Sequence, residues 1–239
     1  MNNQPIEKRR IDADGVLEVH SVFDTIQGEG PFTGRPAVFV RLAGCNLQCP
    51  ACDTDYTSSR WTASPMSLLE FVAEQRKPPS LVVITGGEPF RQHITPFVRI
   101  LLQAGYTVQI ETNGTLAPHD IGFLELCSRN VSEPNKCFVV CSPKTGSVNK
   151  MLLPAICAYK YVMAHDSVAE DGLPLLALDH SASPHVARPH DGFDGAVYLQ
   201  PCDDKDDTIN SANLQACVRS VMNKGFTLQL QVHKIIEVE

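Results

Sequence analysis

The chain has 239 residues, of which 43% are hydrophobic and 20% charged, so it can build a substantial core and is not expected to be disordered. Its net charge of -7 argues against general nucleic-acid binding, which depends on basic residues that neutralise phosphates. No apolar run approaches the roughly 18 residues of a membrane span, and residues 1–15 lack the apolar core of a signal peptide. We therefore expect a cytoplasmic small-molecule enzyme, with a loose leader over residues 1–15 and a single domain over residues 16–239.

Short apolar or β-branched runs bounded by Gly, Pro or polar residues are typical of buried strands in a parallel sheet. In chain order these runs are Leu17–Phe23, Ala37–Leu42, Leu81–Thr85, Thr107–Glu111, Phe138–Ser142, Tyr159–Met163, Ala196–Gln200 and Thr227–Val232. Amphipathic patterns predict helices over Pro65–Arg76, Thr95–Ala104 and Thr208–Lys224. The alternation predicts an α/β fold. A partial (β/α) barrel of about six parallel strands fits this length, and a flat doubly wound sheet fits the same pattern.

Three cysteines stand directly after the predicted strand Ala37–Leu42. Cys45, Cys49 and Cys52 follow the spacing C-x3-C-x2-C, and the chain has nine cysteines in all. In the cytoplasm so many thiols have no disulfide role, so some are candidate metal ligands. Three thiolates can hold three irons of a [4Fe–4S] cluster and leave the fourth iron open to S-adenosylmethionine. A zinc site with a further ligand such as Asp53, or a set of plain buried thiols, also explains the spacing.

A second motif, Thr-Gly-Gly-Glu-Pro, begins at Thr85 and ends the predicted strand Leu81–Thr85. Gly86 and Gly87 permit the backbone to approach a ligand closely, and Glu88 can accept hydrogen bonds from an α-amino group. Beside the cysteine triplet, we interpret this motif as the site for the methionine end of S-adenosylmethionine. Both motifs lie at carboxyl ends of predicted strands, where α/β folds place their sites.

With these motifs the chain resembles the radical S-adenosylmethionine superfamily and, more narrowly, the 7-carboxy-7-deazaguanine synthase family. The resemblance covers nearly the whole chain and rests, besides the two motifs, on Ile26–Gly30, Gly34–Ala37, Phe39–Gly44, Cys52–Thr54, Ile110–Gly114, Cys141–Lys144, Leu199–Pro201 and Gln231–Lys234. It implies a lyase of 7-deazapurine (queuosine) biosynthesis. Such an enzyme converts 6-carboxy-5,6,7,8-tetrahydropterin to 7-carboxy-7-deazaguanine by ring contraction with loss of ammonia.

The resemblance also implies cofactors, partners and site residues. The cofactors are a [4Fe–4S] cluster, S-adenosylmethionine and Mg²⁺, the last with Thr54 as a ligand, and the partners are a flavodoxin-like reductant and a second copy of the chain in a homodimer. The implied cofactor contacts are Ala51, Cys52, Asp53, Gly86, Gly87, Glu88, Ser142, Pro143, Lys144 and Gln200. The implied substrate contacts are Ile26, Gln27, Gly28, Glu29, Arg41, Thr85, His233 and Glu239. Arg41 would pair with the substrate carboxylate, which suits a guanidinium fork.

Several alternatives stay open at this point. Arg41 could instead form a structural ion pair with Glu29, and the Thr54 hydroxyl could cap loop backbone. The whole chain could be a glycyl-radical enzyme activase or a zinc-stabilised binding module without catalysis. Two departures from the family pattern, Ala51 where an aromatic is common and the tail after Lys234, also leave room for an altered activity.

Overall fold

The computed structural model describes residues 2–178 and 185–238. Within these ranges the strands are β1 (Leu17–Ile26), β2 (Pro36–Leu42), β3 (Trp61–Ala63), β4 (Leu81–Gly86), β5 (Thr107–Thr112), β6 (Cys137–Cys141), β7 (Ile156–Met163), β8 (Ala196–Pro201) and β9 (Thr227–Leu228). The helices are α1 (Pro65–Gln75), α2 (Thr95–Gln103), α3 (Gly122–Glu125), α4 (Asp207–Lys224) and α5 (Val232–Ile235). Short 3-10 helices cover Gly30–Phe32, Pro89–Arg91 and Leu153–Ala155.

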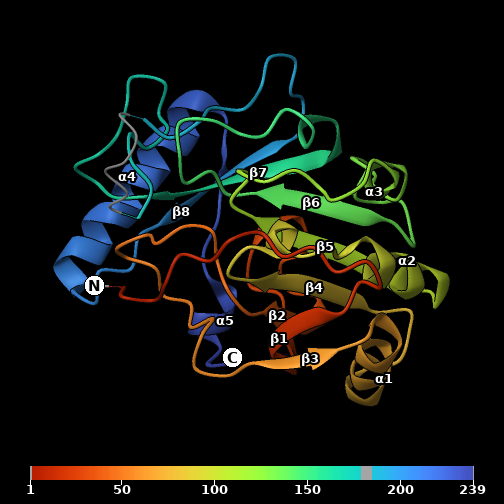
Figure 1. Ribbon diagram of the computed structural model, residues 1–239. Coiled ribbons are helices and arrows are strands. Elements are labelled where there is room, and N and C mark those ends of the chain that lie inside the picture. Colours follow the sequence, from red (N-terminus) through yellow and green to blue (C-terminus); the bar gives the residue numbers. More distant parts are fainter. Residues whose placement is uncertain (1, 179–184, 239) are drawn as a thin grey trace.

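All these strands belong to one sheet with the order β3-β1-β2-β4-β5-β6-β7-β8-β9 (Figure 1). Neighbouring strands from β2 to β9 run parallel, whereas β1 is antiparallel to both β2 and β3. The predicted α/β class with a mostly parallel sheet is therefore confirmed. None of the helices in the described ranges has the length and apolarity of a membrane span.

The predicted strand Thr227–Val232 is wrong beyond its first two residues. Thr227–Leu228 pairs with β8, Gln229 N still donates to Leu199 O at 2.8 Å, and the chain then leaves the sheet and continues to α5. The buried side chain of Gln229 holds the chain at this point, because its Oε1 accepts a hydrogen bond from Gly30 N at 2.5 Å. The tail is thereby joined to the segment that follows β1, which no local pattern could indicate.

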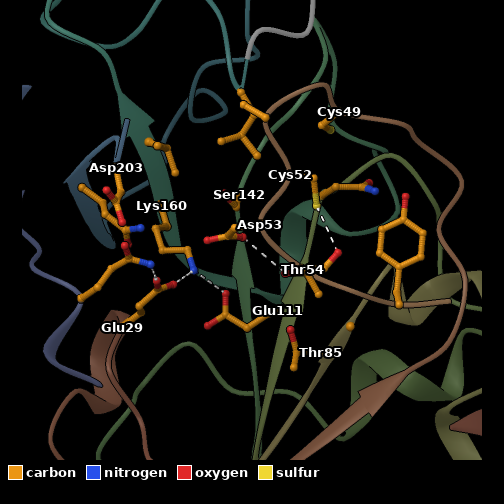
Figure 2. A pocket seen from close by; sticks show the side chains of 18 of the residues that line it. Glu29, Cys49, Cys52, Asp53, Thr54, Thr85, Glu111, Ser142, Lys160 and Asp203 are labelled. Atoms are coloured by element: carbon orange, nitrogen blue, oxygen red, sulfur yellow. Dashed lines mark hydrogen bonds and ion pairs between the residues drawn. The ribbon is translucent and has the colours of Figure 1, made fainter. Parts of the chain in front are cut away.

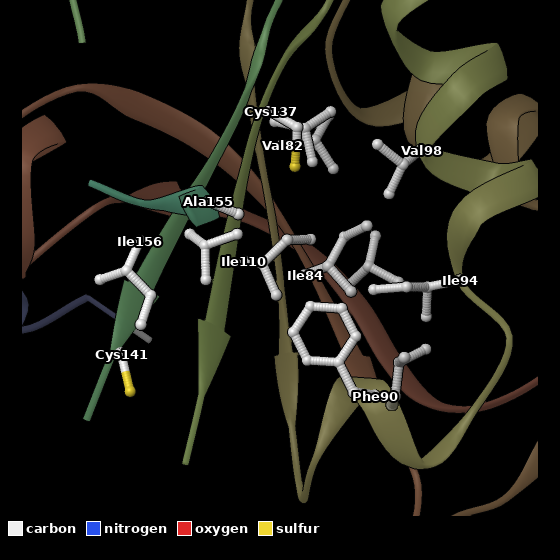
Figure 3. Packing of buried hydrophobic residues seen from close by; sticks show 14 of the residues in the cluster. Val82, Ile84, Phe90, Ile94, Val98, Ile110, Cys137, Cys141, Ala155 and Ile156 are labelled. Carbon is white, nitrogen blue, oxygen red and sulfur yellow. The ribbon is translucent and has the colours of Figure 1, made fainter. Parts of the chain in front are cut away.

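One face of the sheet carries the main hydrophobic core (Figure 3). Alternate strand residues such as Val82, Ile84 and Ile110 are fully buried there against Ile94 and Val98 of the α2 region. Because side chains alternate between the two faces of a strand, the residues between them must point to the other face.

The other face changes character along the strands. Near their amino ends it is apolar, with Ala37, Leu81 and Phe138 buried against Phe32, whose ring lies 5.1 Å from that of Phe138. Toward the carboxyl ends polar and charged side chains replace these residues. This replacement leaves a polar hollow at one edge of the sheet.

Candidate active site

The hollow is a cavity of about 460 Å³ at the carboxyl ends of the parallel strands (Figure 2). It gathers most of the predicted site residues from segments far apart in the sequence. Those in its lining are Ile26, Gln27, Glu29, Arg41, Cys45, Cys49, Ala51, Cys52, Asp53, Thr54, Thr85, Gly86, Gly87, Ser142, Lys144, Gln200 and His233. Arg41, Thr85, Ser142 and Gln200 all reach it from the same face of the sheet, at the ends of β2, β4, β6 and β8.

Three predicted site residues within the described ranges, Gly28, Glu88 and Pro143, are not part of this lining. The predicted contact Glu239 falls outside the described residues. Gly28 nevertheless shapes the cavity, because a Cβ there would lie 1.9 Å from Nδ1 of His233. Only glycine lets α5 bring His233 this close.

Glu88 is fully buried behind the cavity wall. Its Oε1 accepts hydrogen bonds from Phe90 N at 3.0 Å and Thr112 Oγ1 at 2.8 Å, and its Oε2 accepts one from Asn113 N at 2.8 Å. Burial raises the pKa of this carboxyl to about 7, although these hydrogen bonds oppose the shift. In the structure Glu88 therefore ties the end of β4 to the end of β5.

The paired glycines pack against the chain itself. A Cβ on Gly86 would lie 2.1 Å from the carbonyl oxygen of Leu42, and one on Gly87 would lie 2.0 Å from that of Gly44. Glu88 N also donates to Gly44 O at 3.1 Å. The glycines are needed because the turn after β4 lies directly on the backbone that leads into Cys45. The close backbone contact that the two glycines permit is therefore made with the start of the cysteine loop. Both glycines also line the cavity, where a ligand can reach them.

The three cysteines lie in a loop over one side of the cavity. Burial raises the pKa of Cys45 to about 12 and also raises the pKa values of Cys49 and Cys52. Thiolates at such positions need a compensating cation, which fits metal ligation. Among the described residues no three His, Cys, Asp or Glu side chains are grouped so as to hold one ion. A cubane cluster does not require such a group, because each cysteine binds a different iron.

Lys160 of β7 forms the charged floor of the cavity with two carboxylates (Figure 2). Its Nζ contacts Glu29 Oε2 and donates to Glu111 Oε2 at 2.9 Å, while Gln231 Nε2 donates to Glu29 Oε1 at 2.7 Å. Burial alone would raise the pKa of Glu29, but the Lys160 ammonium and the hydrogen bonds lower it to about 2. Glu29 is thus paired with Lys160, and not with Arg41.

Arg41 and Gln200 each bring one polar atom without a hydrogen-bond partner among the described residues to the lining of the cavity. Within the described part of the chain, Arg41 Nε and Gln200 Oε1 are buried without a hydrogen-bond partner. The Arg41 guanidinium also lies over the ring of Phe23, 5.2 Å from its centroid. Buried polar atoms are normally satisfied, so one donor and one acceptor in the same cavity indicate ligand groups that complete them.

Other predicted contacts have the following environments. Lys144 donates to the Ser142 carbonyl at 3.1 Å and to its Oγ at 2.5 Å, and burial lowers the pKa of its ammonium. His233, expected at a strand end, lies in α5, where burial lowers its pKa and favours the neutral imidazole. Thr54 Oγ1 faces Asp53 Oδ1 at 3.5 Å.

Five charged residues of the lining were not predicted as site residues, namely Glu111, Lys160, Asp203, Lys205 and Lys234. Lys160 had a usable signal, since it is a lone charge inside the apolar run of β7. The position of Glu111 was a second usable signal, because Glu111 lies at the carboxyl end of β5 just as Thr85 lies at the carboxyl end of β4. Asp203 forms an ion pair with Lys234 at 2.9 Å and lies in a loop, where no sequence pattern marked it as a site residue.

The chain has close relatives among proteins of named activity. No family model matches the chain. A 7-carboxy-7-deazaguanine synthase of Rhodospirillum rubrum is 43% identical over 231 residues, which cover 93% of this chain and 92% of that protein. The synthase of Rickettsia prowazekii is 37% identical over 240 residues, covering 96% and 92%.

A solved structure gives independent support for the fold. The crystal structure of QueE from Escherichia coli matches with a TM-score of 0.64 and 24% identity, over 90% of this chain and 94% of that one. The two relatives above are similar along nearly their full lengths and far above chance identity. The chain therefore belongs to the 7-carboxy-7-deazaguanine synthase family of the radical S-adenosylmethionine superfamily.

Proposed function

We propose that this protein converts 6-carboxy-5,6,7,8-tetrahydropterin to 7-carboxy-7-deazaguanine and ammonia, a carbon–nitrogen lyase reaction. The observation that carries the proposal is a single cavity that joins the cysteine triplet to the unpartnered Nε of Arg41. A buried guanidinium donor suits a carboxylate, and the proposed substrate has one. The named activity of the relatives supports the same reaction.

Cys45, Cys49 and Cys52 would hold a [4Fe–4S] cluster, for which their spacing and their place on the cavity are suited. When bound, the cluster and S-adenosylmethionine supply a 5′-deoxyadenosyl radical that removes a hydrogen atom from the substrate. Gln200 offers S-adenosylmethionine an unmet acceptor, while Ser142 and Lys144 offer donors. The remaining proposed cofactor contacts are Ala51, Asp53, Gly86 and Gly87, with Glu88 and Pro143 acting from behind the wall.

Glu29 and Glu111 would bind the N–H edge of the pterin. Lys160 keeps Glu29 ionised, and an ionised carboxylate accepts hydrogen bonds from the amino and ring N–H groups of such a heterocycle. Ile26, Gln27, Thr85 and His233 line the same space. The neutral imidazole of His233 adds no positive charge beside Lys160.

We further propose that Thr54 is a ligand of a Mg²⁺ ion. The Thr54 hydroxyl and the neighbouring Asp53 carboxylate both line the cavity, and Mg²⁺ prefers oxygen ligands while it retains several waters. Thr54→Ala should lose Mg²⁺ stimulation of turnover and keep the cluster. Stimulation equal to that of the wild type would remove Thr54 from the proposed site.

Four further features belong to the proposal. The sheet would curve as a partial barrel within one domain, since the cavity lies on a single face and draws on strands from β2 to β8. A flavodoxin-like protein would deliver the electron, and two copies would form a homodimer. A reducing cytoplasm suits the nine cysteines, none of which is in a disulfide.

The direct test is anaerobic turnover of reconstituted protein with dithionite, S-adenosylmethionine, Mg²⁺ and 6-carboxytetrahydropterin, followed by mass spectrometry. We expect 7-carboxy-7-deazaguanine. Formation of 5′-deoxyadenosine without this product would contradict the pterin substrate. A colourless zinc protein would contradict the whole chemistry.

Arg41→Ala tests the carboxylate role within the same assay. The KM for the pterin should rise about 10- to 100-fold, as expected for loss of a charge-assisted hydrogen bond, with little change in S-adenosylmethionine affinity. Arg35→Ala is the matched control, because Arg35 also lies over a ring, that of Phe32 at 5.0 Å, but is exposed and outside the cavity. Equal effects on both ligands would argue against the assignment.

A further inference from the structure

Residues 2–10, here called the strap, were predicted to be part of a loose leader. In the structure they run alongside the cysteine loop, residues 43–60. Ile6 pairs in parallel with Cys45, and Glu7 N donates to Cys45 O at 2.7 Å. Asn2 Nδ2 donates to Cys49 O at 3.1 Å. The strap thus holds the backbone at two of the three proposed cluster ligands.

The side chain of Gln4 contacts the segment of the cysteine loop that follows the third cysteine, Cys52. Its Nε2 donates to Thr54 O at 2.8 Å, and its Oε1 accepts from Tyr56 N at 2.8 Å and from Thr57 Oγ1 at 3.0 Å. The same Thr54 carbonyl lies 3.8 Å from Cys52 Sγ, which donates to it. One amide therefore clamps the segment that follows Cys52.

The far end of the strap is anchored by a buried guanidinium. Arg91 lies 3.3 Å from Glu7 Oε2 and donates to Lys8 O at 3.2 Å on the strap side. It also donates to Ala43 O at 2.8 Å at the start of the cysteine loop. A Cβ on Gly44 would lie 2.7 Å from this guanidinium, so loop and strap rest on the same group.

Two backbone hydrogen bonds join parts of the cysteine loop to each other, from Gly44 N to Tyr56 O at 3.0 Å and from Cys52 N to Cys49 O at 3.1 Å. Residues 43–60 otherwise form neither a helix nor a strand, so the positions of the three thiols depend in large part on contacts made from outside the loop, and the strap supplies those at Cys45, Cys49 and Thr54. Fixing a loop before its ligand arrives removes ordering entropy from the binding step. We infer that the strap is part of the cluster site, and that Gln4 is a positioning residue that holds the cysteine loop in the shape that retains the cluster.

This inference rests on the proposed cluster, and the test uses full-length, anaerobically reconstituted protein. Gln4→Met keeps the volume of the side chain but removes its four hydrogen bonds, three to the cysteine loop and one to Asn2 Oδ1 at 3.2 Å. Asn3→Ala, at an exposed neighbouring position of the strap, is the matched control. The readouts are iron and sulfide per chain, the rate of iron loss to an added Fe²⁺ chelator, and thermal unfolding of the metal-free protein.

Gln4→Met should lose iron about tenfold or more faster than the wild type and Asn3→Ala, because several hydrogen bonds to the loop are lost together. Asn2→Ala should show a smaller acceleration, because its side chain makes two hydrogen bonds to the cysteine loop, to Cys49 O at 3.1 Å and to Tyr56 Oη at 3.4 Å, where that of Gln4 makes three. Metal-free unfolding should stay within a degree or two of the control, about the range of a surface substitution.

Equal rates of iron loss in Gln4→Met and Asn3→Ala would overturn the positioning role. So would faster loss that merely follows a lowered unfolding temperature of the metal-free protein. A failure of the proposed function is distinguishable, because the wild type itself would then hold no four-iron cluster, or would hold it without forming the deazaguanine product.

Discussion

The two faces of the sheet are built from the same strands and carry opposite chemistry. On β4, Ile84 is fully buried under the helices while its neighbour Thr85 lines the cavity. On β7, Tyr159 and Tyr161 are buried in the main core, and Lys160 between them forms the charged floor of the cavity. A single strand therefore supports both the core and the site, because successive side chains alternate between the two faces.

The comparison separates stability from binding. The helix-covered face is apolar and gains free energy by removing hydrocarbon surface from water. The cavity face holds ionised groups whose burial is unfavourable unless each is paired. A substitution on the first face should change stability alone, whereas one on the second should change ligation or binding and should lower stability where it leaves a buried charge unpaired.

The largest expected effect comes from a pair of buried cysteines on opposite faces. Cys49→Ser should abolish the stable cluster and all turnover, because it removes one of three proposed iron ligands. Cys217→Ser, in the helix-side core, should keep the cluster and cost about 1–3 kcal/mol of stability for a buried hydroxyl. Iron analysis, turnover and urea unfolding distinguish them. A Cys49→Ser protein with cluster and activity would refute the ligand assignment.

The next effect concerns the charged floor. Lys160→Met leaves Glu29 and Glu111, whose side chains are 16% and 13% exposed, without their cation, and should cost about 3–5 kcal/mol in urea unfolding. The matched control is Lys136→Met, which breaks an exposed pair with Glu133 at 3.5 Å and should cost no more than about 1 kcal/mol. Equal losses in the two variants would mean that Lys160 is no better shielded than a surface lysine.

The dependence of stability on pH tests whether Glu29 is ionised beside Lys160. The pKa of Glu29 falls from 4.5 to about 2 in the folded protein, so its ionised form stabilises the fold above pH 4.5 and this contribution is lost as pH falls toward 2. The free energy of unfolding of the wild type should exceed that of Glu29→Gln at pH 6, and the gap should narrow by pH 3. A gap that stays constant or widens in acid contradicts the lowered pKa.

The smallest expected effect compares adjacent residues of β4. Ile84→Val should cost about 0.5–1.5 kcal/mol of stability and leave the pterin KM unchanged. Thr85→Val, which keeps the side-chain shape, should raise that KM and change stability by no more than about 0.5 kcal/mol. Stability and KM are measured on both variants. Reversal of the two results would show that the faces are assigned the wrong way round.

Local patterns predicted much of the fold. Apolar runs located the parallel strands from β2 to β8, and amphipathic spacing with Pro65 and Gly225 bounded α1 and α4 closely. The strand predicted over Thr227–Val232 was mostly wrong, because the contact of Gln229 with Gly30 is nearly 200 positions away in the chain. Secondary-structure propensity is a property of neighbouring residues and does not include contacts between residues so far apart in the sequence.

The candidate site divides in the same way. Cys45, Cys49, Cys52 and the Gly86–Gly87 pair could be predicted because their chemistry requires particular residue types at short, fixed spacings. Glu88 could be located by sequence, yet its carboxylate is used to join β4 to β5, since both of its oxygens accept hydrogen bonds from the β5 end and from Phe90 N. The contacts assigned by resemblance remain predictions.

The sequence by itself determined the α/β class, the cysteine triplet and the family, because periodicity and short motifs are properties of neighbouring residues. Only the tertiary structure decided that Lys160 lies between Glu29 and Glu111, that Gly86 and Gly87 pack on the cysteine loop, and that residues 2–10 are bound to this loop. These are pairings between segments distant along the chain. Their partners are selected by the geometry of the folded sheet and by the need to satisfy buried charges and hydrogen bonds, which no local pattern encodes.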